Sequence, residues 1–165
     1  MFEGSGAVIG FGATVLLALC EHKGSEFMEI GNWGGGPVLF PRLDMLEIVV
    51  VDDHKAVRSA LKVFLSGLGA VVHECSDAYH ALEVIIRHQP ALVVSDIAMP
   101  DKDGFELLQE IRSLDLSQKV AVIAITGLSR PLDQIRAPAA GFDAVLIKPF
   151  TPDALLRVIS EVLEL

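Results

Sequence analysis

Five polar residues stand at the ends of short apolar runs, and their types are suited to phosphoryl chemistry. Asp52 and Asp53 follow the first run, and Asp96 ends a later one. Three carboxylates brought together repel one another, so the cluster needs a cation, and hard oxygen ligands suit Mg²⁺. Mg²⁺ favours phosphoryl transfer because it neutralises charge on the transferring oxygens. Lys148 and the Thr126 hydroxyl, which end two further runs, could hold the remaining oxygens.

The elements that must position these residues alternate regularly from Met45 onward. Short runs rich in β-branched residues are typical of strands buried on both faces, and between them apolar residues recur at helical spacing. The expected strands cover residues 46–51, 70–73, 91–96, 120–126 and 144–148. This alternation predicts an α/β fold with a doubly wound, five-stranded parallel sheet. In such sheets ligands bind beyond the carboxyl ends of the strands, where the five polar residues would meet.

Two of the expected helices contain prolines with different consequences. Thr151 is a good N-cap and Pro152 suits the first position of the last helix. Pro138 lies inside the helix expected over residues 132–140, and we expect it to shorten or kink that helix.

Residues 1–44 differ from the rest of the chain in composition. They hold nine of the 14 glycines, which predicts irregular chain. We therefore divide the sequence into a glycine-rich, poorly ordered N-terminal extension, residues 1–44, and a domain, residues 45–165. The apolar run over residues 7–20 has no basic residue before it and is interrupted by glycines, which argues against a signal peptide. The extension is either a poorly ordered segment or translated upstream sequence, and a chain beginning at Met45 is expected to fold and work like the full chain.

Composition excludes several classes of protein. The chain has 165 residues, of which 52% are hydrophobic and 21% charged, which excludes global disorder. Its net charge of −9 argues against direct nucleic-acid binding. Cys20 and Cys75 belong to no Cys/His cluster, which fits a reducing, cytoplasmic location. No apolar run reaches the ~18 residues of a membrane-spanning helix.

The segments at the strand ends resemble the receiver domain of bacterial two-component response regulators. They read VVDDH, SDIAMPDKDG, ITG and IKPF, at residues 50–54, 95–104, 125–127 and 147–150. The resemblance covers about residues 46–165 and implies a stand-alone receiver with a flavodoxin-like sheet.

The resemblance implies a role for each acidic residue of the cluster. Asp96 would be the phosphoacceptor, a carboxylate nucleophile that takes a phosphoryl group from a histidine phosphate. Asp53 and Asp96 would bind Mg²⁺ directly and Asp52 through water. The backbone carbonyl of Ala98 would complete the protein ligands.

The resemblance also implies a switch with one departure from the family pattern. Lys148 would pair with the phosphoryl oxygens, and Thr126 would move toward them. A cis bond before Pro149 would fix the Lys148 loop. Val145 stands where the family often has Tyr or Phe, so the aromatic part of the switch is missing or replaced.

The implied partners are a histidine kinase or a histidine phosphotransfer protein, and a downstream protein target. The chain would be a switch rather than an enzyme. It would either signal directly to its target or pass the phosphoryl group along a relay.

Three other interpretations fit the residues less well. A cobalamin-binding module needs glycine where Val57 stands, and a phosphatase of the haloacid dehalogenase type has its nucleophile on the first strand, whereas Asp96 ends the third. A receiver that never accepts phosphate would have lost an acid, the acceptor or the lysine, and none is lost.

The histidines carry weaker signals. His54, beside the acid pair, is a ligand, a base or simply the start of a helix. The other three in the domain have no partners at metal spacing and are expected at the surface, namely His73, His80 and His88.

Overall fold

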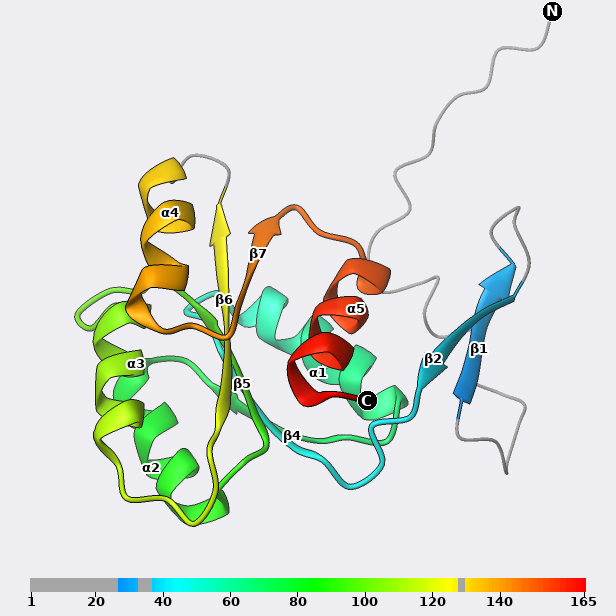
Figure 1. Ribbon diagram of the computed structural model, residues 1–165, viewed down its shortest axis with the longest axis horizontal. Helices are drawn as coiled ribbons and strands as arrows, with labels where there is room; N and C mark the ends of the chain where they lie inside the picture. The colour runs from blue at the N-terminus through cyan, green and yellow to red at the C-terminus, as the bar shows by residue number, and fades with distance from the viewer. Residues whose placement is uncertain (1–26, 33–36, 128–129) are drawn as a thin grey trace, which may run out of the picture.

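A five-stranded parallel sheet between two layers of helices forms the body of the protein (Figure 1). The computed structural model describes residues 27–32, 37–127 and 130–165. The strand order is β4-β3-β5-β6-β7, and all neighbouring pairs are parallel. The strands are β3 (Glu47–Val51), β4 (Val71–Cys75), β5 (Leu92–Asp96), β6 (Ala121–Gly127) and β7 (Ala144–Lys148). The predicted doubly wound α/β fold is confirmed.

Five helices cover the two faces of the sheet (Figure 1). They are α1 (Lys55–Gly67), α2 (Ala78–His88), α3 (Gly104–Ser113), α4 (Pro131–Ala140) and α5 (Pro152–Leu163). Ile48 and Val50 of β3 pack into the core under α1 and α5, whereas Val49 and Val51 pack into the core under α2, α3 and α4. Because side chains alternate along a strand, a continuous apolar run serves both cores.

The helix ends follow the chemistry of their capping residues. Asp103 and Glu106 form a capping box at the start of α3, and the Thr151 hydroxyl accepts from the Ala154 N–H at the start of α5. Pro138 does not shorten α4, which continues to Ala140 and ends at Gly141 with a φ of 102°. A glycine suits that left-handed conformation.

The second strand of the sheet is longer than predicted. β4 continues past His73 because Glu74 and Cys75 pair with Val50 and Val51 of β3. Pairing along the full length of β3 extended the strand beyond its apolar run.

The N-terminal segment contains regular structure that the sequence analysis did not predict. β1 (Phe27–Asn32) and β2 (Pro37–Pro41) form a separate antiparallel pair. The prediction of irregular chain was therefore wrong for these residues. Their sequence has two strand-like runs on either side of a glycine-rich stretch, which is a hairpin pattern, but the prediction rested on the number of glycines alone. Residues 1–26, with the apolar run over 7–20 and its predicted poor order, lie outside the described residues.

One residue assigned to the extension belongs to the core of the domain. Leu43 is completely buried among residues of α1, α5 and the sheet. Its backbone N–H donates to the carbonyl of Leu68 at 2.8 Å. The packed unit thus begins before Met45.

Among the helices of the described ranges, none has the length and apolar character needed to cross a membrane.

Candidate functional site

The sheet brings all five strand-end residues to one edge. Asp52 directly follows β3, and Asp96 ends the neighbouring strand β5. Thr126 lies near the end of β6, and Lys148 ends β7. Parallel strands lie about 4.8 Å apart, and β7 is two strands from β5, so the long side chain of Lys148 can reach Asp96 across the end of β6. The predicted convergence at the carboxyl edge is confirmed.

Lys148 joins two of the acids. Its ammonium Nζ lies 2.8 Å from Asp52 Oδ2 and 3.0 Å from Asp96 Oδ1. Both acids are buried: Asp52 is 1% exposed and Asp96 is 5% exposed. One cation thus balances two carboxylates where water is largely excluded, which strengthens each contact.

The charges of the site act on its pKa values in a consistent way. Burial raises the pKa of Asp96, and the nearby charges of Asp52 and Asp53 add to this, although Lys148 opposes it. Burial by itself lowers the pKa of Lys148, but its bonds to Asp52 and Asp96 outweigh that and hold the pKa above its ordinary value. The positive charge of Lys148 does not fully offset the burial of Asp96 and its carboxylate neighbours, and Lys148 itself stays charged.

Asp53 supplies a carboxylate oxygen that no hydrogen bond satisfies. Its Oδ1 is buried and has no hydrogen bond of good geometry among the described residues, although His54 Nδ1 lies 2.8 Å away. Asp52, by contrast, accepts from the His54 backbone N–H through Oδ1 and from Lys148 through Oδ2. Potential ligand atoms of Asp52, Asp53 and His54 lie within 4.8 Å of one another. This oxygen-rich group, in which Asp53 Oδ1 is held by no well-formed hydrogen bond among the described residues, fits a hard divalent cation.

Arg58 supports the acid pair and was missed in the sequence analysis. Its guanidinium Nη1 donates to the backbone carbonyls of Asp52 and Asp53, at 2.7 and 3.1 Å. These bonds fix the turn between β3 and α1 and leave the carboxylates free. The available signal was a basic residue one helical turn after the acid pair.

The loop after Asp96 needs a glycine at its far end. A Cβ on Gly104 would come within 2.7 Å of the Asp96 carbonyl oxygen and 2.8 Å of Ile97 Cα. The Gly104 N–H donates to the Ile97 carbonyl at 3.0 Å. The start of α3 therefore packs directly against the backbone of this loop, in which Ala98 lies half-buried two residues after Asp96.

Thr126 and its surroundings carry the features expected of a switch, with one difference. The Thr126 hydroxyl is buried and has no hydrogen-bond partner among the described residues. Val145 is half-buried against the core under α2, α3 and α4. The Lys148–Pro149 bond is cis, as the resemblance predicted.

The remaining histidines divide into two groups. His80 is exposed, as expected. His88 is also exposed, as expected, and His73 is half-buried; both lie beside Glu47, far from the acid pair. The prediction that they have no partners at metal-binding distance was wrong, because their spacing in sequence hid a contact made by three separate elements.

The comparison with protein families is unambiguous. Residues 48–160 match the family described as "Response regulator receiver domain". An uncharacterised 14.6 kDa protein from Leptolyngbya boryana is 38% identical over 119 residues, which cover 72% of this chain and 91% of that one. Response regulator Rre1 from Synechocystis is 35% identical, over 72% of this chain and 52% of its own length.

Solved structures agree in fold. A putative response regulator from Chloroflexus aurantiacus superposes with a TM-score of 0.69 at 25% identity, over 74% of this chain and all of that chain. The receiver domain of sensor histidine kinase PA1611 from Pseudomonas aeruginosa superposes with a TM-score of 0.67 at 26% identity, over 73% of this chain and 99% of that one. That domain was crystallised with a magnesium ion coordinated in its active-site cleft.

Proposed function

Since this chain belongs to the response regulator receiver domain family, we propose that it is a phosphorylatable switch whose acceptor is Asp96. One observation carries the proposal: Lys148 contacts both Asp52 and Asp96, beside a buried Asp53 oxygen that accepts no hydrogen bond from the part of the chain that the structure describes. One lysine does not neutralise three carboxylates, so the site can take up a divalent ion and a phosphoryl group together.

The chemical step is transfer of a phosphoryl group to the Asp96 side chain. Lys148 holds Asp96 Oδ1, and within the described ranges Oδ2 accepts no hydrogen bond. Oδ2 is therefore the oxygen that forms the new bond to phosphorus. The bond from phosphorus to the donor's histidine nitrogen breaks, and the imidazole keeps the electron pair. The product is an acyl phosphate on the protein itself, so the chain acts as a switch.

The residues around Asp96 fit a resident Mg²⁺. Asp53 would hold the ion directly through Oδ1, in place of its contact with the exposed His54 ring, together with Asp96 and the Ala98 backbone carbonyl. Asp52 would act through water, because Lys148 and the His54 N–H already engage its two oxygens. When bound, the ion supplies positive charge against the phosphoryl oxygens. The magnesium in the similar PA1611 receiver supports this assignment.

Phosphorylation would be reported through Thr126 and α4. The buried Thr126 hydroxyl, which bonds to none of the described residues, can donate to a phosphoryl oxygen and so draw the end of β6 toward the site. The helix that follows, α4, exposes Leu132 and Ile135, each more than 70% accessible. Two large apolar side chains on the element next to the switch suit a protein partner. Val145 is too small for a large inward rotation, so we expect the changes to concentrate in α4 rather than β7.

The donor would be a histidine kinase or a histidine phosphotransfer protein, and the acceptor of the signal another protein. Direct signalling to a target and onward transfer along a relay both remain consistent with this site. A net charge of −9 argues against direct nucleic-acid contact.

Intact-mass measurement tests the acceptor. The full chain is incubated with Mg²⁺ and acetyl phosphate, with Asp96→Asn and Asp101→Asn in parallel. Asp101 is the matched control, because it is an exposed acid in the same loop whose positive φ of 64° Asn also tolerates. We expect one phosphoryl group on the wild type and on Asp101→Asn, and none on Asp96→Asn. Equal labelling of Asp96→Asn would refute the assignment.

A further inference from the structure

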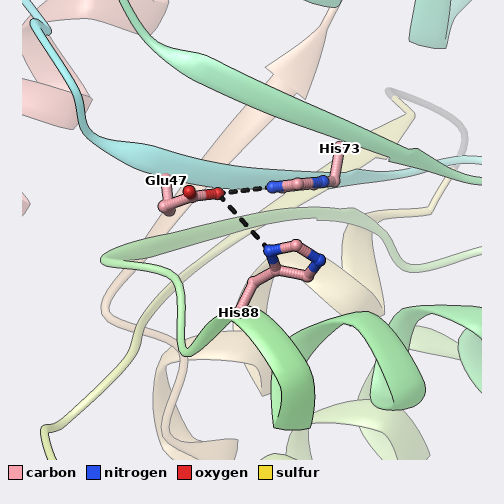
Figure 2. A group of neighbouring side chains, drawn as sticks. All are labelled: Glu47, His73 and His88. Carbon is pink, nitrogen blue, oxygen red and sulfur yellow. Dashed lines mark hydrogen bonds and ion pairs between the residues drawn. The ribbon is translucent and has the colours of Figure 1, made fainter.

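A second group of potential metal ligands lies near the amino ends of the strands, on the face covered by α2 (Figure 2). Glu47 begins β3, His73 lies in the middle of β4, and His88 ends α2. We propose that these three side chains form a binding site for Zn²⁺, with a solvent molecule as the fourth ligand. The site is separate from the phosphorylation site and does not depend on the proposed function.

The donor atoms already converge. Glu47 Oε2 contacts His73 Nε2 and lies 4.0 Å from His88 Nδ1, as the dashed lines of Figure 2 show. The three ligand atoms lie within 4.8 Å of one another. Around a tetrahedral Zn²⁺ with bonds of about 2.0–2.2 Å, ligand atoms lie roughly 3.3–3.6 Å apart. Side-chain rotations that lengthen the contact between Glu47 and His73, and shorten the distance between Glu47 and His88, would bring the ligand atoms to that spacing.

The donor types favour zinc over magnesium. Two imidazole nitrogens and one carboxylate oxygen form the ligand set of zinc sites that keep an open position. Imidazole suits Zn²⁺ and related transition ions, whereas Mg²⁺ prefers oxygen. The group around Asp53 is oxygen-rich, so the two ends of the sheet would select different ions.

The two imidazole rings are placed to share an ion. Their centroids lie 4.1 Å apart with the planes inclined at 38°. Two protonated rings at that distance would repel each other, whereas two neutral rings can each offer a nitrogen lone pair to a metal. The geometry therefore allows both rings to face one ion together with the Glu47 carboxylate.

The backbone fixes the ligands in place. His73 lies opposite Val49, two residues beyond Glu47, so both side chains project from the same face of a paired strand. His88 lies in the last turn of α2, where the helix dipole favours a cation. β4 is an edge strand, and the three side chains are 23–36% exposed. The site is thus supported by three elements yet open to solvent.

The position of the cluster makes the test separable from phosphorylation. Glu47 and Asp52 lie at opposite ends of β3, roughly 17 Å apart for five residues of strand. Zinc at Glu47 would join the end of α2 to β3 and β4, so it should also raise the melting temperature.

Spectra of the histidine rings test the location. The ¹⁵N-labelled full chain is saturated with Mg²⁺, to occupy the oxygen-rich site, and Zn²⁺ is then added to one equivalent. We expect the ring signals of His73 and His88 to shift first and those of His54 and His80 to remain. Shifts confined to His54, or to His22 outside the described ranges, would overturn the proposal.

Affinity measurements on variants provide the second readout. Calorimetry should give at least a tenfold loss of Zn²⁺ affinity for His88→Gln and for Glu47→Gln. His80→Gln is the matched control, because it removes an exposed imidazole from the same helix, and it should bind as tightly as the wild type. Wild-type affinity in both cluster variants would likewise overturn the proposal.

Discussion

The two ends of the parallel sheet differ in how fully a largely buried carboxylate is paired with positive charge and hydrogen-bond donors. At the amino ends of β6 and β7, Asp143 accepts from Arg112 at 2.7 Å and from Lys119 at 2.8 Å. It also accepts from the backbone N–H of Val122 at 2.8 Å. Burial by itself raises the pKa of Asp143, but these three partners outweigh it and hold the pKa below its ordinary value.

At the carboxyl ends of β3 and β5 the balance is reversed. Asp52 and Asp96 share the ammonium of Lys148, and no described residue donates a hydrogen bond to a buried oxygen of Asp53. The pKa of Asp96 is raised rather than lowered. Polar groups that are fully satisfied stabilise the fold, whereas those left unsatisfied are available for an ion or a phosphoryl group. Substitutions should therefore have opposite consequences at the two ends.

The largest effect on stability is expected at the amino end, where Leu43 enters the core. Leu43→Ala should lower the free energy of unfolding by about 3 kcal/mol, because it leaves a cavity among packed side chains. Denaturant titration measures this, with Met45→Ala as the exposed neighbouring control. A chain beginning at Met45 loses the same contacts and should be destabilised similarly, in contrast to the expectation from sequence. Equal stability of Leu43→Ala and wild type would contradict the placement of Leu43 in the core.

The next effect concerns the metal at the carboxyl end. Asp53→Asn should weaken Mg²⁺ binding by at least about 100-fold, since removing second-shell support already costs up to that factor. That is about 2.8 kcal/mol of binding energy. It should not lower stability without the metal, because one of three mutually repelling carboxylates is neutralised. Calorimetric titration with Mg²⁺ measures the affinity, and Asp101→Asn should bind like the wild type.

The corresponding acid at the amino end should behave differently. Asp143→Asn should lower the free energy of unfolding by about 2 kcal/mol at neutral pH, because Arg112 and Lys119 lose a charged acceptor. Since the folded-state pKa is depressed, this stabilisation exists above the unfolded value of about 3.9 and is lost as the pH falls through the folded value. The difference in the free energy of unfolding between the wild type and Asp143→Asn should therefore disappear at low pH.

Denaturant titrations at several pH values check the Asp143 prediction. Asp115→Asn changes an exposed acid nearby and should have little effect. If the difference in the free energy of unfolding stayed constant down to acid pH, the charge of the Asp143 carboxylate would not be the source of the stabilisation.

The smallest effect has the opposite sign. Thr126→Val should raise the free energy of unfolding by about 1 kcal/mol, because it keeps the shape of the side chain and removes a buried hydroxyl that has no partner within residues 27–32, 37–127 and 130–165. Thr151→Val should lower it by about 1 kcal/mol, because that hydroxyl caps α5. Thermal unfolding of the pair measures both, and a destabilised Thr126→Val would show that the hydroxyl is satisfied in the resting protein.

The contrast between the two ends also shows how far sequence reasoning reaches. Alternating apolar runs indicate the strands, and the carboxyl-end rule then predicts that Asp52, Asp53, Asp96, Thr126 and Lys148 share an edge. This worked because strand periodicity and chain alternation are local properties, and the parallel sheet converts them into position. The cis bond before Pro149 came from the family resemblance, since no local signal indicated it.

Features that depend on how separate elements pack could not be predicted in this way. Leu43 enters the core only because the chain before β3 runs beside the end of α1, and Arg58 reaches two carbonyls across a turn. His73 meets Glu47 from 26 positions away, through the pairing of β3 with β4. The sequence by itself determined the order of the elements and the residues at their ends, because these follow from local pattern. Tertiary structure alone decided which side chains from distant elements meet, because register and helix packing set those contacts.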